Sequence, residues 1–476
     1  MTNFESYQRA RIAHWDIVAQ QLDNWTGWGG GYHKRLTHIY RSLVPLHQCV
    51  LEIGCGRGDL LAALQPADGL GVDFSPEMLE RARQRHPEIQ FVLADVHNLS
   101  MLDRPFDFIL VSDLLNDIWD VQTMLEQLMR LSHSRTRLII NSYNRLWELP
   151  LAVAENLRLA NPVLKQNWLA PPDIINLLDL TRFEMIRHWS EILFPLEIPL
   201  LSRFLNQNLV KIWPFSEFAL TSFFLARPQI SPEHAINQQL VSVIIPARNE
   251  AGNIPQIFTH MPEMGAGIEM VFVEGHSQDD TYSVIERQIT EHPERRCQLH
   301  QQTGIGKGDA VRLGMAYATG DVVMIYDADL TVPFEDLPRF FKALCTGRGE
   351  FINGVRLVYP MEGEAMRFLN LWGNKFFSLA FSWLLGQPIK DTLCGTKAVW
   401  KADYDLIAAN RSYFGDFDPF GDYDLIFGAT KLGLKIIDLP IHYQARTYGS
   451  TNIQRWRHGW LLLRMVIIAA RRIKFI

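Results

Sequence analysis

The stretch Leu51-Glu-Ile-Gly-Cys-Gly-Arg-Gly-Asp59 runs from an apolar segment into a turn with glycine at every second position. Glycine at 54, 56 and 58 lets the turn adopt dihedral angles closed to other residues and lets its backbone approach a ligand closely. The pattern predicts a buried strand, a glycine-rich loop and the start of a helix, and it decides how the first half of the chain folds.

Apolar β-branched runs continue outward from this stretch and alternate with segments long enough for helices. They occupy residues 50–53, 69–72, 91–93, 108–111 and 138–140. A second series begins downstream, at residues 241–245, 270–273 and 322–326. Such alternation predicts α/β folds with parallel sheets, whose ligands bind where the strands end.

The polar stretch 227–239 contains two prolines and separates the two series of strands. A chain of 476 residues also exceeds what one hydrophobic core usually holds. We therefore predict two domains, residues 1–228 and 241–476, joined by a linker over residues 229–240.

The amino-acid composition argues against several classes of protein. With 47% hydrophobic and 21% charged residues the chain is globular, and its net charge of −6 argues against general nucleic-acid binding. Five scattered cysteines show no metal-ligand spacing, and the N-terminus lacks a signal-peptide pattern, so we expect a cytoplasmic protein. The apolar stretches 376–389 and 460–470 are too short or too charged to cross a bilayer, which needs about 20 apolar residues.

Two acids complete the first glycine motif. Asp73 closes the next strand at the distance where an acid would accept hydrogen bonds from ribose hydroxyls, and Asp95 ends the following strand. Together the motifs resemble class I S-adenosylmethionine-dependent methyltransferases, which have a Rossmann-like fold, over roughly residues 1–228. The resemblance implies that the cofactor S-adenosyl-L-methionine binds at the residues Glu52, Gly54, Gly56, Gly58, Asp73 and Asp95, with Asp73 at the ribose and Asp95 near adenine. It also implies that residues 183–194 and 218–226 form a closing antiparallel pair.

The competing interpretation is a dinucleotide-binding oxidoreductase with a GxGxxG loop. Here the loop reads GCGRGD, and Asp59 would repel a pyrophosphate, so the methyltransferase is favoured. Methyl transfer depends mainly on positioning, and the sequence therefore identifies the methyl acceptor poorly. Ser112, Asp113, Asn116 and residues 141–144 follow the fourth and fifth strands, where they line an acceptor pocket or serve as caps and turns.

The second half carries four motifs in order. They are Val241-Ser-Val-Ile-Ile-Pro-Ala-Arg-Asn-Glu250, Val271-Phe-Val-Glu-Gly-His-Ser-Gln-Asp-Asp-Thr281, Gly306-Lys-Gly-Asp-Ala310 and Gly320-Asp-Val-Val-Met-Ile-Tyr-Asp-Ala-Asp329. Their order and spacing resemble family 2 glycosyltransferases of the GT-A fold, whose donor is a nucleotide-diphosphate sugar.

The resemblance assigns the donor site. Pro246, Arg248 and Glu250 surround base and ribose, Glu274 contacts the nucleoside, and Lys307 and Asp327 lie towards the nucleotide sugar. Asp327 and Asp329 provide hard oxygen ligands for Mg²⁺ or Mn²⁺, which a diphosphate leaving group requires. Many relatives have two aspartates where this chain has Glu274 and Gly275, so a UDP-linked and a GDP-linked donor both stay open.

The C-terminal third resembles polyprenyl-phosphate sugar transferases, including dolichyl-phosphate mannose synthases, at residues 353–356, 367, 391–397 and 446–455. Arg356, Arg367 and Arg446 would then pair with an acceptor phosphate, which needs no general base, or they form ordinary surface salt bridges. Asp422 occupies the region where relatives acting on hydroxyl groups carry their base, and Asp424 is its neighbour.

We predict helices that lie at a membrane interface in two segments, residues 366–388 and 453–476. The first is dense in aromatic residues, including Phe376, Phe381 and Trp383. The second places Trp456, Trp460, Leu463 and Ile467 on one stripe, and no acidic residue follows Asp438. These features favour peripheral attachment to the cytoplasmic face of a membrane, although an ordinary buried helix and a solvated helix are the alternatives.

Together these features predict a bifunctional enzyme. Its second domain would transfer a sugar, with inversion, from a nucleotide diphosphate to a polyprenyl phosphate or other glycan acceptor, and its first would methylate an unidentified acceptor. The alternatives are transfer to a sugar hydroxyl or small metabolite, and a first domain that serves only as a scaffold.

Overall fold

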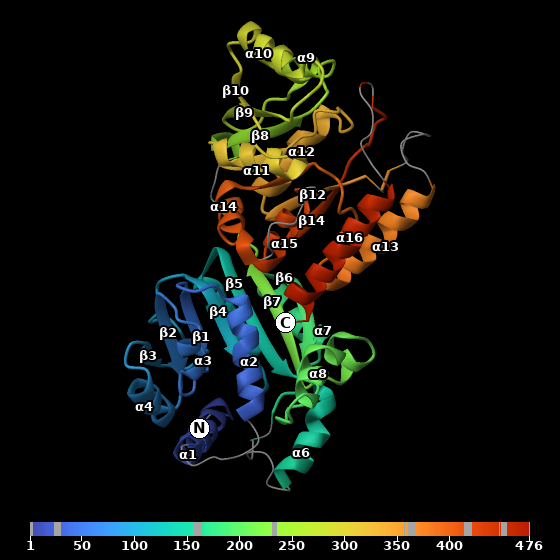
Figure 1. Ribbon diagram of the computed structural model, residues 1–476. Coiled ribbons are helices and arrows are strands. Elements are labelled where there is room, and N and C mark those ends of the chain that lie inside the picture. The colour runs from blue at the N-terminus through green and yellow to red at the C-terminus, as the bar shows by residue number, and fades with distance from the viewer. Residues whose placement is uncertain are drawn as a thin grey trace. The chain divides into compact units, whose positions relative to one another are not determined.

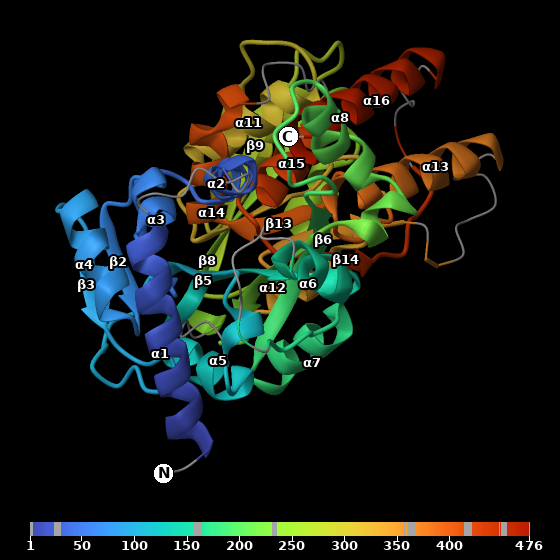
Figure 2. The ribbon, with the colours of Figure 1, turned by 90° about the horizontal axis from the view of Figure 1, so that it is seen from below.

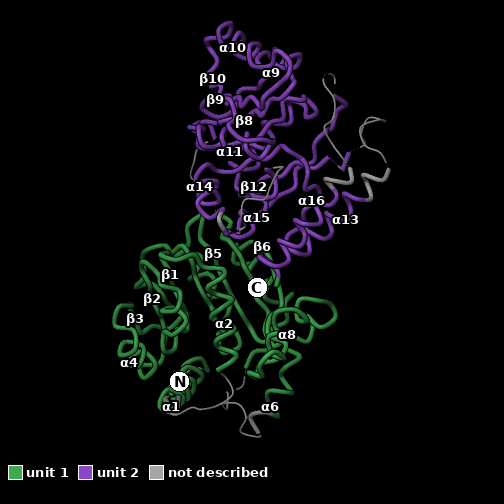
Figure 3. Tube along the Cα trace, viewed as in Figure 1, with its two compact units in different colours: residues 1–230, 475–476 green, residues 231–474 purple. Residues whose placement is uncertain are grey.

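The computed structural model describes residues 3–22, 30–156, 164, 166–230, 236–356, 358–359, 368–413, 421–446, 448 and 455–475. The chain forms two compact units, residues 1–230 with 475–476 and residues 231–474 (Figure 3). Each unit contains one seven-stranded sheet with helices packed on it (Figure 1). The predicted fold class, two successive α/β units, is confirmed.

The first unit is built on the sheet order β3-β2-β1-β4-β5-β7-β6. Its strands are β1 (Cys49–Ile53), β2 (Asp68–Asp73), β3 (Gln90–Leu93), β4 (Phe106–Ser112), β5 (Ser132–Tyr143), β6 (Phe183–Glu191) and β7 (Thr221–Pro228). The first five strands run parallel, and β7 lies antiparallel between β5 and β6. The antiparallel pair expected at the end of this unit is present.

Helices cover both faces of this sheet (Figure 2). They are α1 (Asn3–Leu22), α2 (Gly30–Leu43), α3 (Asp59–Ala63), α4 (Pro76–Arg85), α5 (Val121–Arg130), α6 (Glu148–Asn156), α7 (Pro171–Leu180) and α8 (Leu201–Gln207). The apolar stripes of α2, α3 and α4 form one core with the sheet, and those of α5 and α7 form the core on the other face. Local signals start these helices: Ser75 and Asp120 cap α4 and α5 by accepting backbone N–H groups.

The second unit is built on the sheet order β10-β9-β8-β11-β13-β12-β14. Its strands are β8 (Leu240–Ala247), β9 (Gly267–Glu274), β10 (Arg296–Gln301), β11 (Val322–Ile325), β12 (Phe351–Val355), β13 (Lys397–Trp400) and β14 (Ile436–Pro440). Strands β10, β9, β8 and β11 run parallel, and β13 is antiparallel to both of its neighbours. The carboxyl ends of β8, β9 and β11 therefore meet at one edge.

Helices again cover both faces of the second sheet. They are α9 (Ile254–His260), α10 (Thr281–Glu291), α11 (Lys307–Tyr317), α12 (Leu337–Cys345), α13 (Phe368–Leu385), α14 (Lys401–Ala409), α15 (Tyr423–Lys431) and α16 (Arg455–Ala469). Helices α9, α10 and α12 share one core, and α11 and α13–α16 share the other. Helix α11 approaches the sheet at Gly314, where a Cβ atom would meet Ile244 at 2.4 Å.

Helices α13 and α16 pack against each other (Figure 1). Phe381 on α13 is fully buried, as the ordinary-helix alternative expects, whereas Phe376 and Trp383 are exposed. On α16, Trp460 is 69% exposed. Within the described part of the chain, no helix has the length and apolar character needed to span a bilayer.

Candidate active sites

The glycine loop of the first unit follows β1 and precedes α3. Gly54, Gly56 and Gly58 all have positive φ, at 71°, 50° and 72°. A Cβ atom at Gly56 would meet nothing within 4 Å, so the loop presents bare backbone to open space there. Only glycine adopts this conformation three times without strain, which is why the alternating pattern was a readable signal.

Asp73 anchors this loop from the end of β2. Its Oδ2 accepts the Gly56 N–H at 2.8 Å, and its Oδ1 accepts the Ser75 N–H at 2.9 Å. Burial raises the pKa of Asp73, although these N–H groups act in the opposite direction. Asp73 therefore sets the shape of the loop as well as the polarity beside it.

Glu52 lies beneath the loop. Its Oε2 accepts the Leu61 N–H at 3.1 Å, and burial raises its pKa to about 8. The side chain is almost entirely enclosed, so it supports the start of α3. Its predicted contact with a cofactor stays a prediction.

Asp95 lies beside a pocket that α1 helps to line. It accepts Gln8 Nε2 at 2.7 Å and the His97 N–H at 2.9 Å. The pocket also has aromatic walls, formed by Phe4, Tyr7, Phe74 and Trp119. Flat apolar walls with a carboxylate suit a nucleoside base, and the contribution of α1 could not be read from the sequence motifs.

Two of the residues predicted to line a methyl-acceptor pocket converge at the ends of β4 and β5. Asn141 donates its amide to Asp113 Oδ1, which also accepts Tyr32 OH at 2.7 Å. By contrast, Asn116 bonds to backbone and to Ser142. Asn144 and Ser112 sit at the ends of their strands, and Asn144 accepts the Leu146 N–H as a helix cap. The interpretation as a cap therefore describes Asn144, whereas Asn116 is buried and links the segment after β4 to β5 and to residue 167.

In the second unit, the loops after β8 and β9 are joined by hydrogen bonds. Asn249, in the left-handed region with φ 58°, donates its N–H to Ser277 Oγ at 3.0 Å and accepts the Gln278 N–H at 2.7 Å. The Glu250 N–H reaches Thr281 Oγ1 at 2.9 Å. This joined pair of loops forms one wall of the candidate donor site.

The predicted nucleoside contacts lie along this wall. Pro246 is at the end of β8 and Arg248 is exposed on the loop. Glu250 accepts Asn253 Nδ2 at 2.7 Å, and burial raises its pKa to about 7 against the nearby positive charge of Arg446. Glu274 is buried at the end of β9, where hydrogen bonds from the 276–277 backbone outweigh burial and lower its pKa.

The two aspartates after β11 each face a cation. Lys307 Nζ lies 2.7 Å from Asp327 Oδ1, and Arg446 Nη2 lies 2.6 Å from Asp329 Oδ2. Burial of Asp327 is outweighed by Lys307, which lowers the pKa of that carboxyl. Gly395, within the quoted segment 391–397, was given no role of its own: a Cβ atom there would collide with Asp327 and Lys307, so glycine lets these two side chains approach the backbone.

The donor set is compatible with a small divalent cation. Among the described residues, no group of three or more His, Cys, Asp or Glu side chains is arranged around a metal position. Mg²⁺ at phosphate sites, however, commonly takes one or two carboxylates and completes its shell with water and substrate phosphates. Asp327 and Asp329 would provide these carboxylates.

Asp422 is buried in an ion pair with Lys397. The two side chains are 5% and 1% exposed, and Nζ lies 2.9 Å from Oδ1. Lys397 also helps to lower the pKa of Asp327. The pairing of Lys397 with Asp422 was not predicted, because no local pattern links side chains that are 25 residues apart.

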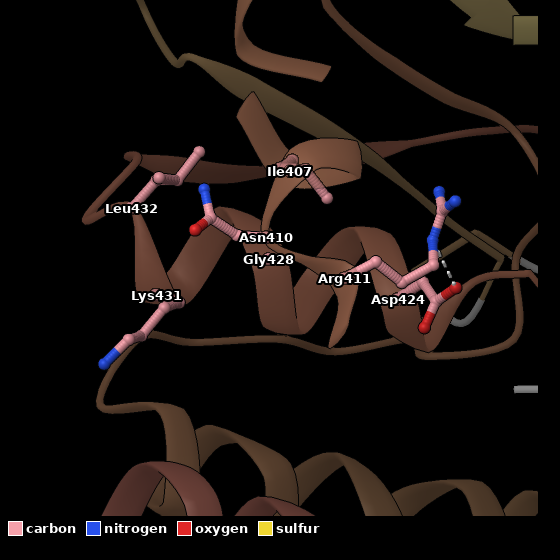
Figure 4. A pocket seen from close by; sticks show the side chains of 7 residues that line it. All are labelled: Ile407, Asn410, Arg411, Asp424, Gly428, Lys431 and Leu432. Atoms are coloured by element: carbon pink, nitrogen blue, oxygen red, sulfur yellow. Dashed lines mark ion pairs between the residues drawn. The ribbon is translucent and has the colours of Figure 1, made fainter. Parts of the chain in front are cut away.

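Asp424 also forms ion pairs. Its Oδ2 lies 3.2 Å from Arg411 Nε and 3.4 Å from Arg312 Nη1. Figure 4 shows the carboxylate of Asp424 turned towards Arg411 at one end of a small pocket between α14 and α15. Neither Asp422 nor Asp424 is in the arrangement expected of a ready general base.

The three arginines predicted at the acceptor phosphate are in different situations. Arg356 forms a bidentate pair with buried Asp391, with distances of 2.7 and 2.9 Å. Arg446 bridges Asp329 and Glu250, the latter at 3.7 Å. Arg367 lies outside the described residues. Their predicted role stays a prediction, and Asp391 is a partner that the sequence motifs did not reveal.

Comparisons with known proteins agree with the two sets of motifs. Residues 47–192 match the family described as a methyltransferase domain, and residues 242–402 match glycosyl transferase family 2. The glycosyltransferase AglJ of Haloferax volcanii is 27% identical over 224 residues, which cover 47% of this chain and 69% of that protein. An undecaprenyl-phosphate 4-deoxy-4-formamido-L-arabinose transferase of Pseudomonas syringae is 26% identical over 177 residues, covering 36% and 51%.

Solved structures resemble each half separately. Magnesium protoporphyrin IX methyltransferase from Synechocystis aligns with a TM-score of 0.34 and 17% identity, covering 47% of this chain and 99% of that one. Glucosyl-3-phosphoglycerate synthase from Mycobacterium tuberculosis aligns with a TM-score of 0.36 and 18% identity, covering 49% and 80%. The family matches confirm both resemblances that the sequence motifs indicated.

Proposed function

We propose that this chain, an enzyme with a methyltransferase domain and a glycosyl transferase family 2 domain, transfers a sugar from a nucleotide diphosphate to a polyprenyl phosphate. The methyltransferase domain takes its methyl group from S-adenosylmethionine. Each activity has its own site at the carboxyl edge of its own sheet.

The observation that carries the sugar transfer is the convergence at the end of β11. Asp327, Asp329 and Lys307 meet there beside the joined loops after β8 and β9. A nucleotide diphosphate brings a nucleoside, which suits the loop wall, and two phosphates, which suit Lys307 and Arg446. Asp327 and Asp329 would hold Mg²⁺ or Mn²⁺, which neutralises the departing diphosphate.

The ion pairs of the neighbouring acids support a phosphate acceptor. A hydroxyl acceptor would require a general base, yet Asp422 is locked to Lys397 and Asp424 lies between two arginines. A phosphate oxygen is already ionised and can attack without a base. Direct attack in a single displacement inverts the configuration of the sugar. The relative from Pseudomonas syringae, named as a transferase for undecaprenyl phosphate, supports this acceptor class.

The surface of α13 and α16 supports attachment to a membrane, where a polyprenyl phosphate resides. Exposed apolar side chains gather on these two packed helices, namely Phe376, Leu379, Trp383, Trp460, Leu463 and Ile467. Arg464, Arg471 and Arg472 are exposed along the same C-terminal segment. Large apolar side chains next to basic ones suit an anionic bilayer surface. We place this surface on the cytoplasmic face, since both donor molecules are cytoplasmic metabolites.

The decisive experiment incubates the full-length protein with Mg²⁺ or Mn²⁺, radiolabelled UDP- and GDP-sugars, and polyprenyl phosphate in detergent. Label entering the organic phase identifies donor and acceptor together. Label that stays aqueous although the nucleotide sugar binds would contradict the lipid-phosphate acceptor. Activity on soluble hydroxyl compounds, lost in Asp422→Asn, would instead support the alternative acceptor.

A further inference from the structure

Asp113 directly follows β4 and has an unusual backbone conformation. Its φ of 52° lies in the left-handed region, which non-glycine residues seldom adopt and which is frequent at functional sites. Its Oδ1 accepts two hydrogen bonds, from Tyr32 OH and from the Asn141 amide. Its Oδ2 has no hydrogen-bond partner among the described residues, so one carboxylate oxygen is available while the other fixes the side chain.

The segment that carries this carboxylate lies beside the glycine loop. Strands β1 and β4 are parallel neighbours, with Ile53 opposite Val111, so the loop and the segment after β4 leave the sheet together. Contact between the two is direct: a Cβ atom at Gly54 would meet the Leu114 side chain at 2.9 Å. Asp113, adjacent to Leu114, is therefore next to the loop assigned to the methyl donor.

The surroundings of Asp113 are polar and uncharged. Tyr40 OH donates to Asn141 Oδ1 at 2.7 Å, which directs the amide nitrogen towards Asp113. Burial and the charge of Asp113 raise the pKa values of Tyr32, Tyr40 and Tyr143, so these phenols stay protonated. Within the described residues, no lysine or arginine forms an ion pair with Asp113. Burial accordingly raises its pKa to about 6.

We propose that Asp113 accepts the proton released during methyl transfer, and that the methyl acceptor is a neutral alcoholic hydroxyl group of a sugar or polyol. The inference rests on the methyltransferase half of the proposed function. As the hydroxyl oxygen bonds to the methyl carbon, the bond from that carbon to sulfur breaks and the sulfur keeps the electron pair. The hydroxyl proton moves to Asp113 Oδ2.

The charge of the site selects this acceptor class. A carboxylate or phosphate acceptor is already ionised, needs no base, and would be repelled by Asp113. An ammonium group has no lone pair for the attack until its proton has left, whereas a neutral hydroxyl keeps its lone pairs and becomes acidic only as its oxygen bonds to the methyl carbon. A neutral hydroxyl group is not repelled by the charge of Asp113, and it can pass its proton to that carboxylate.

The first test measures binding in the full-length protein. Calorimetry with S-adenosylhomocysteine should give the same affinity, within about threefold, for the wild type, Asp113→Asn and the control Asp103→Asn, which changes an exposed acid in the same domain. The protein saturated with S-adenosylhomocysteine is then titrated with methyl glucoside and with the matching glucuronide. We expect the wild type to favour the neutral sugar at least tenfold and Asp113→Asn to lose this preference.

The second test follows label from [methyl-³H]S-adenosylmethionine into millimolar methyl glycosides, glycerol and inositol, with glucuronides and sugar phosphates as anionic probes. Transfer to a neutral probe should rise with pH up to about 6 and then level off. Asp113→Asn should lower kcat by 10²–10⁴-fold, the usual contribution of a general base, while Asp103→Asn leaves it unchanged.

Three results would overturn the inference: label in the carboxylate or phosphate of an anionic probe, undiminished turnover by Asp113→Asn, or binding of S-adenosylhomocysteine with no neutral probe labelled. Failure to bind S-adenosylhomocysteine would contradict the methyltransferase assignment itself. The two failures are therefore distinguishable.

Discussion

The two sites occupy the same place in two similar sheets but differ in their charge. In the first unit burial raises the pKa values of Glu52, Asp73 and Asp113, and none of these three forms an ion pair with a lysine or arginine among the described residues. In the second unit Asp327 and Asp329 are each paired with a cation, and Lys307 lowers the pKa of Asp327. The difference lies in the side chains that each sheet brings together and not in the direction of its strands.

This contrast matches the ligands proposed for the two sites. A sulfonium donor carries a positive charge, which an ionised carboxylate such as Asp113, with no cationic partner among the described residues, stabilises. A nucleotide diphosphate carries negative charge, which lysine, arginine and a divalent cation neutralise together. One fold class can thus serve opposite ligand charges because the strand ends are loops whose side chains vary independently of the core.

The largest effect is expected at the paired acids of the second unit. Replacing Asp327 and Asp329 together by asparagine removes both metal ligands and should lower sugar transfer by at least about 10³-fold. Transfer of radiolabelled sugar measures the loss, with Asp405→Asn, an exposed acid on α14, as the control. Binding of S-adenosylhomocysteine should not change. If the variant still transfers sugar at the wild-type rate, Asp327 and Asp329 take no part in the reaction.

Two lysine–aspartate pairs of the second unit differ in burial, and we expect them to differ in their contribution to stability. Lys397→Met leaves Asp422 buried without its partner and should lower the free energy of unfolding by about 3–5 kcal/mol. Lys401→Met breaks the partly exposed pair with Asp405 and should cost at most about 1 kcal/mol. Urea unfolding of both variants measures the difference, and equal losses would show that the Lys397 pair is hydrated in solution.

The raised pKa of the buried Glu52 carboxyl predicts that the stability of the first unit depends on pH. Its carboxyl ionises at about pH 8 when folded, against a usual value of 4.5, so stability should fall as the pH rises between these values. Glu52→Gln should remove this slope and stabilise the unit by on the order of 4 kcal/mol at pH 8. Calorimetry resolves this transition as the one shifted by S-adenosylhomocysteine. A slope that persists in the variant would assign it to other groups.

The smallest effect is expected where one acid anchors the glycine loop. Asp73→Asn keeps the shape of the side chain but weakens acceptance of the Gly56 and Ser75 N–H groups. The affinity for S-adenosylhomocysteine should fall about tenfold, a loss of about 1.4 kcal/mol. Isothermal calorimetry measures it beside Asp103→Asn. An unchanged affinity would show that Asp73 contributes nothing beyond its size.

Most of the fold could be predicted because its signals are local. The apolar runs became strands of the two sheets, the glycines at 54, 56 and 58 adopted left-handed conformations, and the boundary between the two compact units falls within the proline-containing stretch 227–239. The acids at strand ends could also be found, since a parallel sheet collects the carboxyl ends of its strands at one edge.

The sequence alone determined which residue types end the strands, because strand and turn preferences act between near neighbours. Only the tertiary structure decided what those residues face. Lys397 with Asp422, Arg356 with Asp391, and Tyr32 with Asp113 join positions 25, 35 and 81 residues apart. A charge or a hydroxyl acquires its pKa and its partner from burial and from side chains that arrive with other elements, which no local pattern encodes.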